Sequence, residues 1–61
     1  MRLKDAKKLQ NRDEVKVRKE TGGWEYGHVL GTPFLISPKQ IIIQVQNPSD
    51  GYREVSHLDV R

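Results

Sequence analysis

The chain has 61 residues and no cysteine, so it allows one small domain without disulfides. A core of this size stabilises a fold by only about 3–5 kcal/mol, and thiolate metal sites are excluded. No stretch approaches the roughly 20 apolar residues that cross a bilayer, and the N-terminal residues lack the apolar segment of a secretory signal. We therefore expect one cytoplasmic domain over residues 1–61, with no membrane partner.

The net charge of +3 is distributed unevenly along the chain. Residues 1–19 carry eight basic and three acidic side chains, whereas residues 20–61 carry three basic and five acidic ones. A basic segment of this kind is typical of proteins with an anionic partner such as a nucleic acid. It is equally compatible with a charged surface that only contacts water.

Residues 3–10 have the apolar spacing of one or two helical turns. A helix this short is not stable by itself in water, so Leu3 and Leu9 are expected to dock on the rest of the domain. We assign residues 1–12 to a helical leader with a turn, and residues 13–61 to a β-domain.

Two β-strands are expected next. Residues 14–19 alternate between valines and charged side chains, which is typical of a half-buried strand. Gly22 and Gly23 then supply the turn, because glycine accepts the positive φ angles of a tight hairpin. Residues 24–30 form the second strand, and Gly27 in its middle predicts a bulge or a sharp bend.

The second strand presents two different faces. One face, which we call the aromatic face, consists of Trp24, Tyr26, His28 and Leu30. The opposite face consists of Glu25, Gly27 and Val29. A barrel with few large side chains needs its rings in the core, and the opposite face offers one apolar side chain of any size. The pattern therefore predicts that the aromatic face points inward.

The second half of the chain continues with strands and turns. Residues 31–39 contain two prolines and are expected to form a loop. Residues 40–46 alternate as a strand with Ile and Val on one face, and the polar turn at 47–51 leads to a strand at 52–56. Residues 57–60 are expected to form a 3₁₀ turn followed by a last short strand pairing.

This layout resembles the SH3-like small β-barrels, which include the Tudor-like and KOW-like domains. The resemblance is carried by Val15–Val17, Trp24–Leu30, Ile41–Val45 and Arg53–Val60. It implies a mainly β fold, namely an SH3-like five-stranded antiparallel barrel with a short N-terminal helical turn, and a function in binding. The leader, Leu3–Val15, also looks like that of small uncharacterised proteins of phages and mobile elements.

Catalysis is not predicted. Val17–Trp24 resembles the opening strand and turn of the plasmid-encoded type II dihydrofolate reductases, which are SH3-like barrels that work as tetramers around a pore. Their active-site tetrapeptide, Val-Gln-Ile-Tyr, has no counterpart here, and Tyr52–Val55 differs from it. His28 and His57 have no nucleophile at a known spacing, and the carboxylates form no paired motif. We therefore predict no catalytic, cofactor-binding or metal-binding residues.

A basic and aromatic set of residues suggests weak binding to DNA or RNA. Clustered cations release counterions from phosphates, and exposed rings stack on bases. No base-reading motif is present, so the binding is expected to be electrostatic. The candidate residues for this interface are Lys7, Lys8, Arg12, Lys16, Arg18, Trp24 and Tyr26.

A binding site for a protein or peptide is the alternative. Aromatic rings that surround a methylated or otherwise cationic side chain attract it by about 0.5–2 kcal/mol each. The candidate cage residues are Trp24, Tyr26, Phe34 and Tyr52. A homodimer that pairs through an exposed edge strand is a further possibility. The sequence therefore predicts a small non-enzymatic binding or adaptor module, with nucleic-acid binding favoured.

Overall fold

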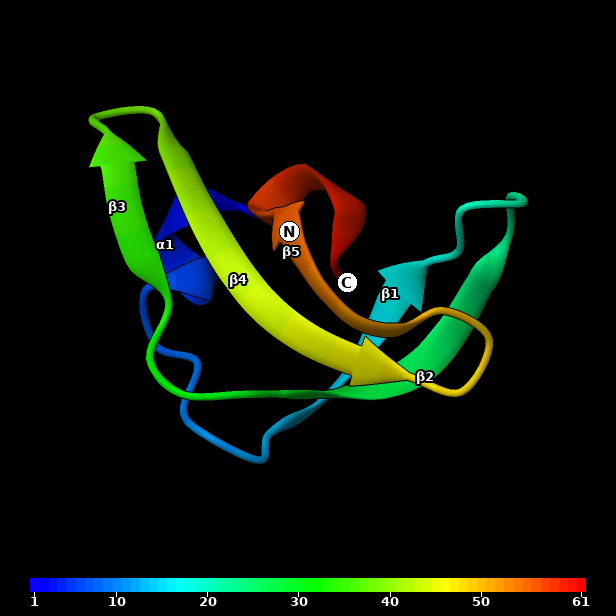
Figure 1. Ribbon diagram of the computed structural model, residues 1–61. Helices are drawn as coiled ribbons and strands as arrows, with labels where there is room; N and C mark the ends of the chain where they lie inside the picture. The colour runs from blue at the N-terminus through cyan, green and yellow to red at the C-terminus, as the bar shows by residue number, and fades with distance from the viewer.

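The computed structural model describes all 61 residues and shows a mainly β fold, as predicted (Figure 1). Its elements are α1 (Leu3–Ala6), β1 (Glu14–Arg18), β2 (Trp24–Val29), β3 (Phe34–Ser37), β4 (Gln40–Asn47), β5 (Gly51–Ser56) and the 3₁₀ turn η1 (His57–Asp59). The five strands and the single short helical turn match the expected content. None of the helical segments has the length and apolar character to span a bilayer.

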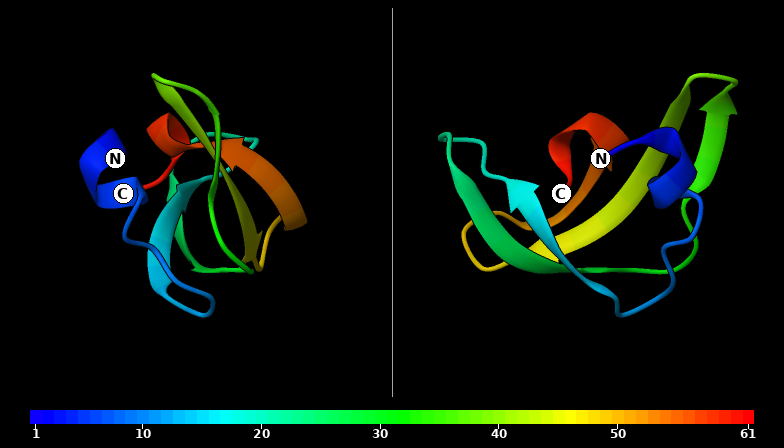
Figure 2. Two further views of the ribbon diagram at one scale, coloured as in Figure 1. Left: turned by 90° about the vertical axis from the view of Figure 1, so that its left-hand side faces the viewer. Right: turned by 180° about the vertical axis from the view of Figure 1, so that it is seen from behind.

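The five strands form one antiparallel sheet around β4 (Figures 1 and 2). β5 runs along one edge of β4, while β3 pairs with the first half of the other edge and β2 with the second half. β1 pairs with β2 along its whole length. The sheet does not close into a complete barrel. An isolated bridge nevertheless joins Val17 of β1 to Val60 near the end of the chain.

The core is built from one face of this curved sheet. The expected alternation in β4 is confirmed, since Ile41, Ile43 and Val45 are all buried. The complete core consists of Ala6, Val15, Val17, Val29, Ile41, Ile43, Val45, Val55 and Val60. Because these side chains are mostly small, the core is thin, which agrees with the marginal stability expected for the chain length.

The leader docks on this core, as predicted. Ala6 is fully buried, and Met1, Leu3 and Leu9 pack against the core residues. The helix forms one of the one or two turns expected over residues 3–10, and the chain turns toward β1 after Ala6. The amino group of Met1 donates hydrogen bonds to the carbonyls of His57 and Val60, at 3.0 and 2.6 Å.

The loop expected at residues 31–39 contains a strand. Phe34–Ser37 forms β3 because the first half of β4 has a free edge, and Phe34 pairs there opposite Ile42. The flanking Pro33 and Pro38 restrict this pairing to four residues. All four side chains of β3 are exposed. The prediction of a loop was therefore wrong, although the prolines do mark the ends of the strand.

The predicted orientation of β2 was also wrong. Gly27 and Val29 are buried, whereas His28 is exposed and Tyr26 is 58% exposed, so the aromatic face points outward. A Cβ atom on Gly27 would lie 2.5 Å from the carbonyl oxygen of Gln46, which leaves no room for rings where β2 crosses β4. The β1–β2 register runs unbroken past Gly27, so the glycine permits a close strand crossing instead of a bulge.

Candidate nucleic-acid interface

The outer face of the β1–β2 hairpin carries a row of cations and rings. Alternation buries the valines of β1 and turns Lys16 and Arg18 outward. The antiparallel register places Lys16 opposite Tyr26 and Arg18 opposite Trp24. Directly opposite residues in such a pair have their side chains on the same face and about 5 Å apart. Each cation therefore has an aromatic neighbour across the hairpin.

The cations lie over the rings. The Lys16 ammonium is 5.3 Å from the centroid of the Tyr26 ring, and the Arg18 guanidinium is 4.7 Å from that of Trp24. These distances fall within the range of cation–π attraction. Arg18 also forms an ion pair with Asp59, in which Nε and Oδ1 are 3.1 Å apart. The side chains of this row are thus held in place before any partner arrives.

Arg61 extends the row and was missed in the sequence. Its guanidinium lies 4.1 Å from the centroid of the Trp24 ring. Its backbone exchanges two hydrogen bonds with Lys16, at 2.8 and 3.1 Å, which fixes the position of the side chain. The expected last strand pairing after the 3₁₀ turn, here Val60 on Val17, was the signal that would have placed Arg61 beside β1. We call Lys16, Arg18, Trp24, Tyr26 and Arg61 the cation–ring row.

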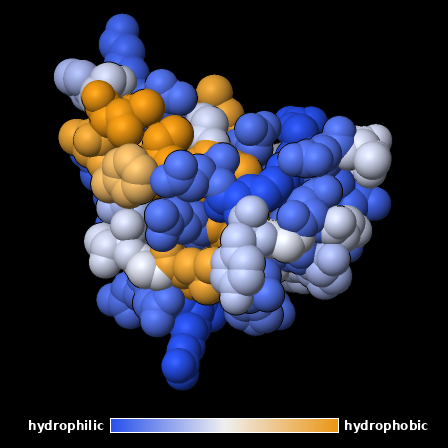
Figure 3. All heavy atoms as spheres, in the orientation of Figure 1, coloured by the Kyte–Doolittle hydropathy of each residue, from blue (hydrophilic) through white to orange (hydrophobic).

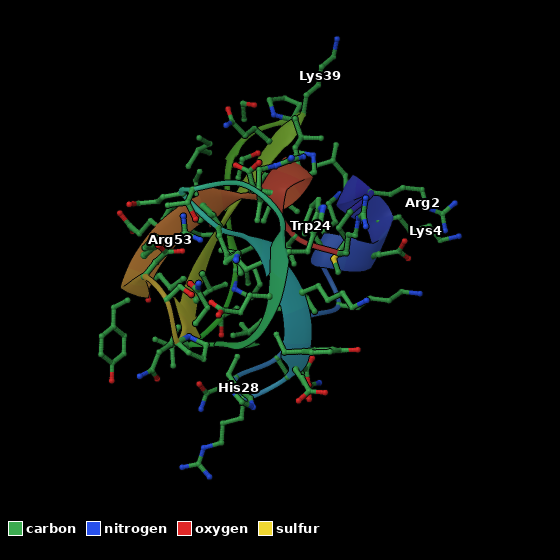
Figure 4. The ribbon with its side chains drawn as sticks, turned by 90° about the vertical axis from the view of Figure 1, so that its right-hand side faces the viewer. Arg2, Lys4, Trp24, His28, Lys39 and Arg53 are labelled. Atoms are coloured by element: carbon green, nitrogen blue, oxygen red, sulfur yellow. The ribbon has the colours of Figure 1, made fainter.

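The other predicted phosphate contacts lie on the leader. Lys7, Lys8 and Arg12 are all exposed, and none of their side chains forms a hydrogen bond, ion pair or cation–π contact with the cation–ring row. Figure 4 shows Arg2 and Lys4 projecting outward from α1. The structure therefore brings together the strand residues of the predicted set, and it leaves the leader residues as separate exposed cations.

A polar cluster supports the hairpin from its inner side. Glu25 accepts hydrogen bonds from the side chain of the buried Asn47 (2.7 Å) and from the backbone and hydroxyl of Ser49 (3.0 and 2.7 Å). The hydrogen bond from Asn47, followed by those from Ser49, lowers the pKa of Glu25 below its ordinary value of 4.5. This ionised carboxylate anchors the β4–β5 turn to β2.

Arg53 connects this cluster to the cation–ring row. Its Nη2 donates to the carbonyl oxygen of Arg18 at 2.7 Å and lies 3.4 Å from the carboxylate of Asp50. The Arg53 side chain is only 16% exposed, so its charge is directed inward. Arg53 is therefore a positioning residue for the backbone of Arg18. It is not an additional surface cation.

The four predicted cage residues do not surround one point. Trp24 and Tyr26 share the outer face of β2, but their rings already contact cations of this chain. Phe34 lies opposite Ile42 of β4, and Tyr52 lies opposite Gln46, which is four residues further along β4. That separation is about 13 Å, more than twice the reach of a ring over a cation. Tyr52 lines a pocket of about 280 Å³ to which none of the other three cage residues contributes.

Comparisons with protein families, with curated proteins and with solved structures find no match. Function is therefore inferred from the residues of this chain alone.

Proposed function

We propose that the chain is an SH3-like binding module that holds single-stranded nucleic acid weakly on the cation–ring row. The SH3-like assignment is supported by the way the chain returns to its first strand. After η1, Val60 bridges to Val17, and Arg61 exchanges backbone hydrogen bonds with Lys16. A 3₁₀ turn before such a last pairing, in a small bent sheet, is the layout that the sequence resembles.

The observation that carries the binding proposal is the alternation of cations and rings on one exposed face. Lys16, Arg18 and Arg61 supply positive charge for phosphates, and Trp24 and Tyr26 supply surfaces for bases. The two rings are two residues apart on β2, about 6.7 Å along the strand. Successive bases of an extended strand stack on neighbouring rings in this way, without sequence preference.

Single strands fit this face better than duplexes do. The only α-helix, α1, has four residues, so the chain has no recognition helix that would enter a major groove. In a duplex the faces of the bases are stacked on each other, whereas in a single strand they are free to meet Trp24 and Tyr26. Binding through three cations and two rings is weak and depends strongly on salt.

A methyl-lysine or other cationic peptide is the less favoured partner. The electron-rich faces of Trp24 and Tyr26 already attract Lys16, Arg18 and Arg61 of the same chain. A base must displace these side chains from the rings as well, but they can then turn to its phosphates, whereas an incoming cation would displace them and be repelled by them. An anionic partner would be attracted by them, so the row favours phosphate over ammonium ligands.

The test is a titration of the protein with a single-stranded oligonucleotide, followed by its intrinsic fluorescence. Trp24 is the only tryptophan, so quenching reports on the proposed site directly. We expect quenching at low salt, and an affinity that falls with log salt with a slope of roughly −2, because three phosphate contacts contribute about −0.7 each.

A duplex of the same sequence and a methyl-lysine peptide serve as matched titrations. Equal quenching by the duplex would contradict the preference for single strands. No binding of either nucleic acid at low salt would remove the proposal. Quenching by the methyl-lysine peptide and by neither nucleic acid would support the alternative function, which is peptide binding.

A further inference from the structure

We infer that β3 pairs with β3 of a second copy of this chain, in an antiparallel arrangement that joins two sheets across a two-fold axis. β3 is the last strand on the path β1–β2–β4–β3, and only β4 pairs with it. Figure 1 and the right-hand view of Figure 2 both show it at the outer flank of the molecule. This inference does not depend on the proposed nucleic-acid binding.

The backbone of Leu35 faces the open edge of β3. The N–H of Ile41 donates to Nδ1 of the buried His57 at 3.3 Å, so Ile41 points toward the side of β4 where β5 and η1 lie. Alternate residues of a strand point to opposite edges, so Ile42 bonds to Phe34, its partner in β3. The next residue, Leu35, then directs its N–H and C=O away from β4. A second strand can pair with these groups in place of water.

The side chains of β3 add an apolar surface to this edge. Phe34, Leu35 and Ile36 are 43%, 55% and 52% exposed. Figure 3 shows apolar side chains gathered at the upper left, over the end of the β3–β4 hairpin. Contiguous exposed apolar residues of this kind mark interaction sites on small proteins. Pairing along β3 would cover them on both copies.

The charge distribution favours a second copy as the occupant. Between Tyr26 and Ser49 the chain carries a single charged side chain, Lys39, although charged residues make up 31% of the sequence. Residues 30–38 carry none. A two-fold antiparallel pairing of β3 centred on Leu35 therefore brings no like charges together, and it sets Leu35 against its own copy and Phe34 against Ile36 of the second copy.

The expected dimer is weak. Stable interfaces bury about 1,200–2,000 Å² in total, and a pairing of two four-residue strands buries less. Pro33 and Pro38 prevent the pairing from extending in either direction, because proline has no N–H to donate. Association through β3 is therefore expected to depend on concentration and to stop at two copies, because one partner fills the open edge of β3.

The test is a concentration series in the analytical ultracentrifuge, at low and raised salt. We expect the weight-average mass to rise from 7.1 kDa toward twice that value, and raised salt to preserve or strengthen the association because it screens the repulsion between two basic chains. Nucleic-acid binding weakens with salt, so failure of one proposal is distinguishable from failure of the other. A constant mass up to millimolar concentration, or growth beyond a dimer, would overturn the inference.

Two exposed residues provide the matched variants. Leu35→Lys places like charges across the proposed axis and is expected to abolish the rise in mass, whereas Tyr52→Lys, on β5 and 72% exposed, is expected to dimerise like the unmodified protein. Equal association of Leu35→Lys would contradict pairing through β3. Should Leu35→Lys fail to fold, amide shifts of the unmodified chain decide instead. Concentration-dependent shifts confined to Phe34–Ser37 support the pairing, and shifts elsewhere overturn it.

Discussion

The two hairpins of this molecule have the same architecture but opposite surfaces. In the β1–β2 hairpin, every outward position from Glu14 to Arg18 is charged, and the facing strand supplies two rings and His28. In the β3–β4 hairpin, Lys39 is the only charge, and the other exposed side chains are apolar, a serine hydroxyl or neutral amides. The shared geometry shows that the fold alone does not select a partner. The side chains on each outer face do.

The hairpins also differ in how they are supported. Val15, Val17 and Val29 seat the β1–β2 hairpin on the core along most of its length. In the β3–β4 hairpin only β4 contributes buried residues, and β3 contributes none. The first hairpin is therefore anchored on the core, which suits binding of a flexible strand. In the second hairpin, β3 buries no side chain, and the feature that it offers to a partner is its unpaired backbone edge.

The largest expected effect is at the crossing that joins the two hairpins. Gly27→Ala forces a Cβ against the backbone of Gln46 and is expected to destabilise the fold by about 2–3 kcal/mol, a loss on the order of 10–20 °C in Tm. His28→Ala, at the next and exposed position, is the control and should change stability by less than about 0.5 kcal/mol. Thermal unfolding measures both. Equal melting temperatures for Gly27→Ala and His28→Ala would contradict the close approach of β2 to the backbone of Gln46.

The next effect compares one ring from each hairpin. Trp24→Leu removes a stacking surface and should lower the affinity for a labelled single-stranded oligonucleotide by about 1–3 kcal/mol, or roughly 5- to 150-fold. Phe34→Leu makes the same change in side-chain type on β3 and should leave the affinity unchanged. Fluorescence anisotropy of the labelled strand measures both variants. A similar loss of affinity in Phe34→Leu would mean that the oligonucleotide contacts the outer faces of both hairpins.

A smaller effect concerns the carboxylate that anchors β2 to the β4–β5 turn. The pKa of Glu25 is lowered in the folded state, so its contribution to stability is complete above the ordinary value of 4.5 and is lost as the pH falls through the lowered pKa. Unmodified protein should therefore lose more stability than Glu25→Gln on acidification below 4.5. Urea unfolding at a series of pH values measures the difference. Parallel curves would contradict an ionised, hydrogen-bonded Glu25.

The smallest effect compares one lysine from each hairpin. Lys16→Gln removes one phosphate contact and should make the salt dependence of oligonucleotide binding shallower by about 0.7, while unfolding remains almost unchanged. Lys39→Gln removes the same charge from the β3–β4 hairpin and should leave the slope as it is. Equal changes in slope would indicate attraction by net charge alone, without a defined row.

Much of the fold was predictable because hydrophobic alternation has a period of two residues. It identified β1 and β4 and the buried positions Ile41, Ile43 and Val45, while the polar turn before residue 52 marked the start of β5. It could not orient β2, where both faces carry apolar side chains. The deciding factor there was the close approach of Gln46 to Gly27, a contact between strands that are distant in the sequence. β3 was missed for a similar reason, since its pairing depends on a free edge of β4.

The candidate site was predictable in part. The alternation in β1 correctly placed Lys16 and Arg18 on one outward face, and the register brought Trp24 and Tyr26 to them. Arg61 joined the row only through long-range pairing with Lys16. Arg53, whose role depends on a bond to the carbonyl oxygen of Arg18, has no local pattern that would distinguish it from a surface arginine.

The pairing of Arg61 with Lys16 has a consequence for folding. Contacts between residues this far apart in sequence close large loops, so they are expected to form late, after the hairpins are in place. The cation–ring row is then complete only in the fully folded chain, and unfolding of the last residues would dismantle it. A ligand on the row would bind the folded state alone and would raise the stability of a marginal domain in proportion to the logarithm of its concentration.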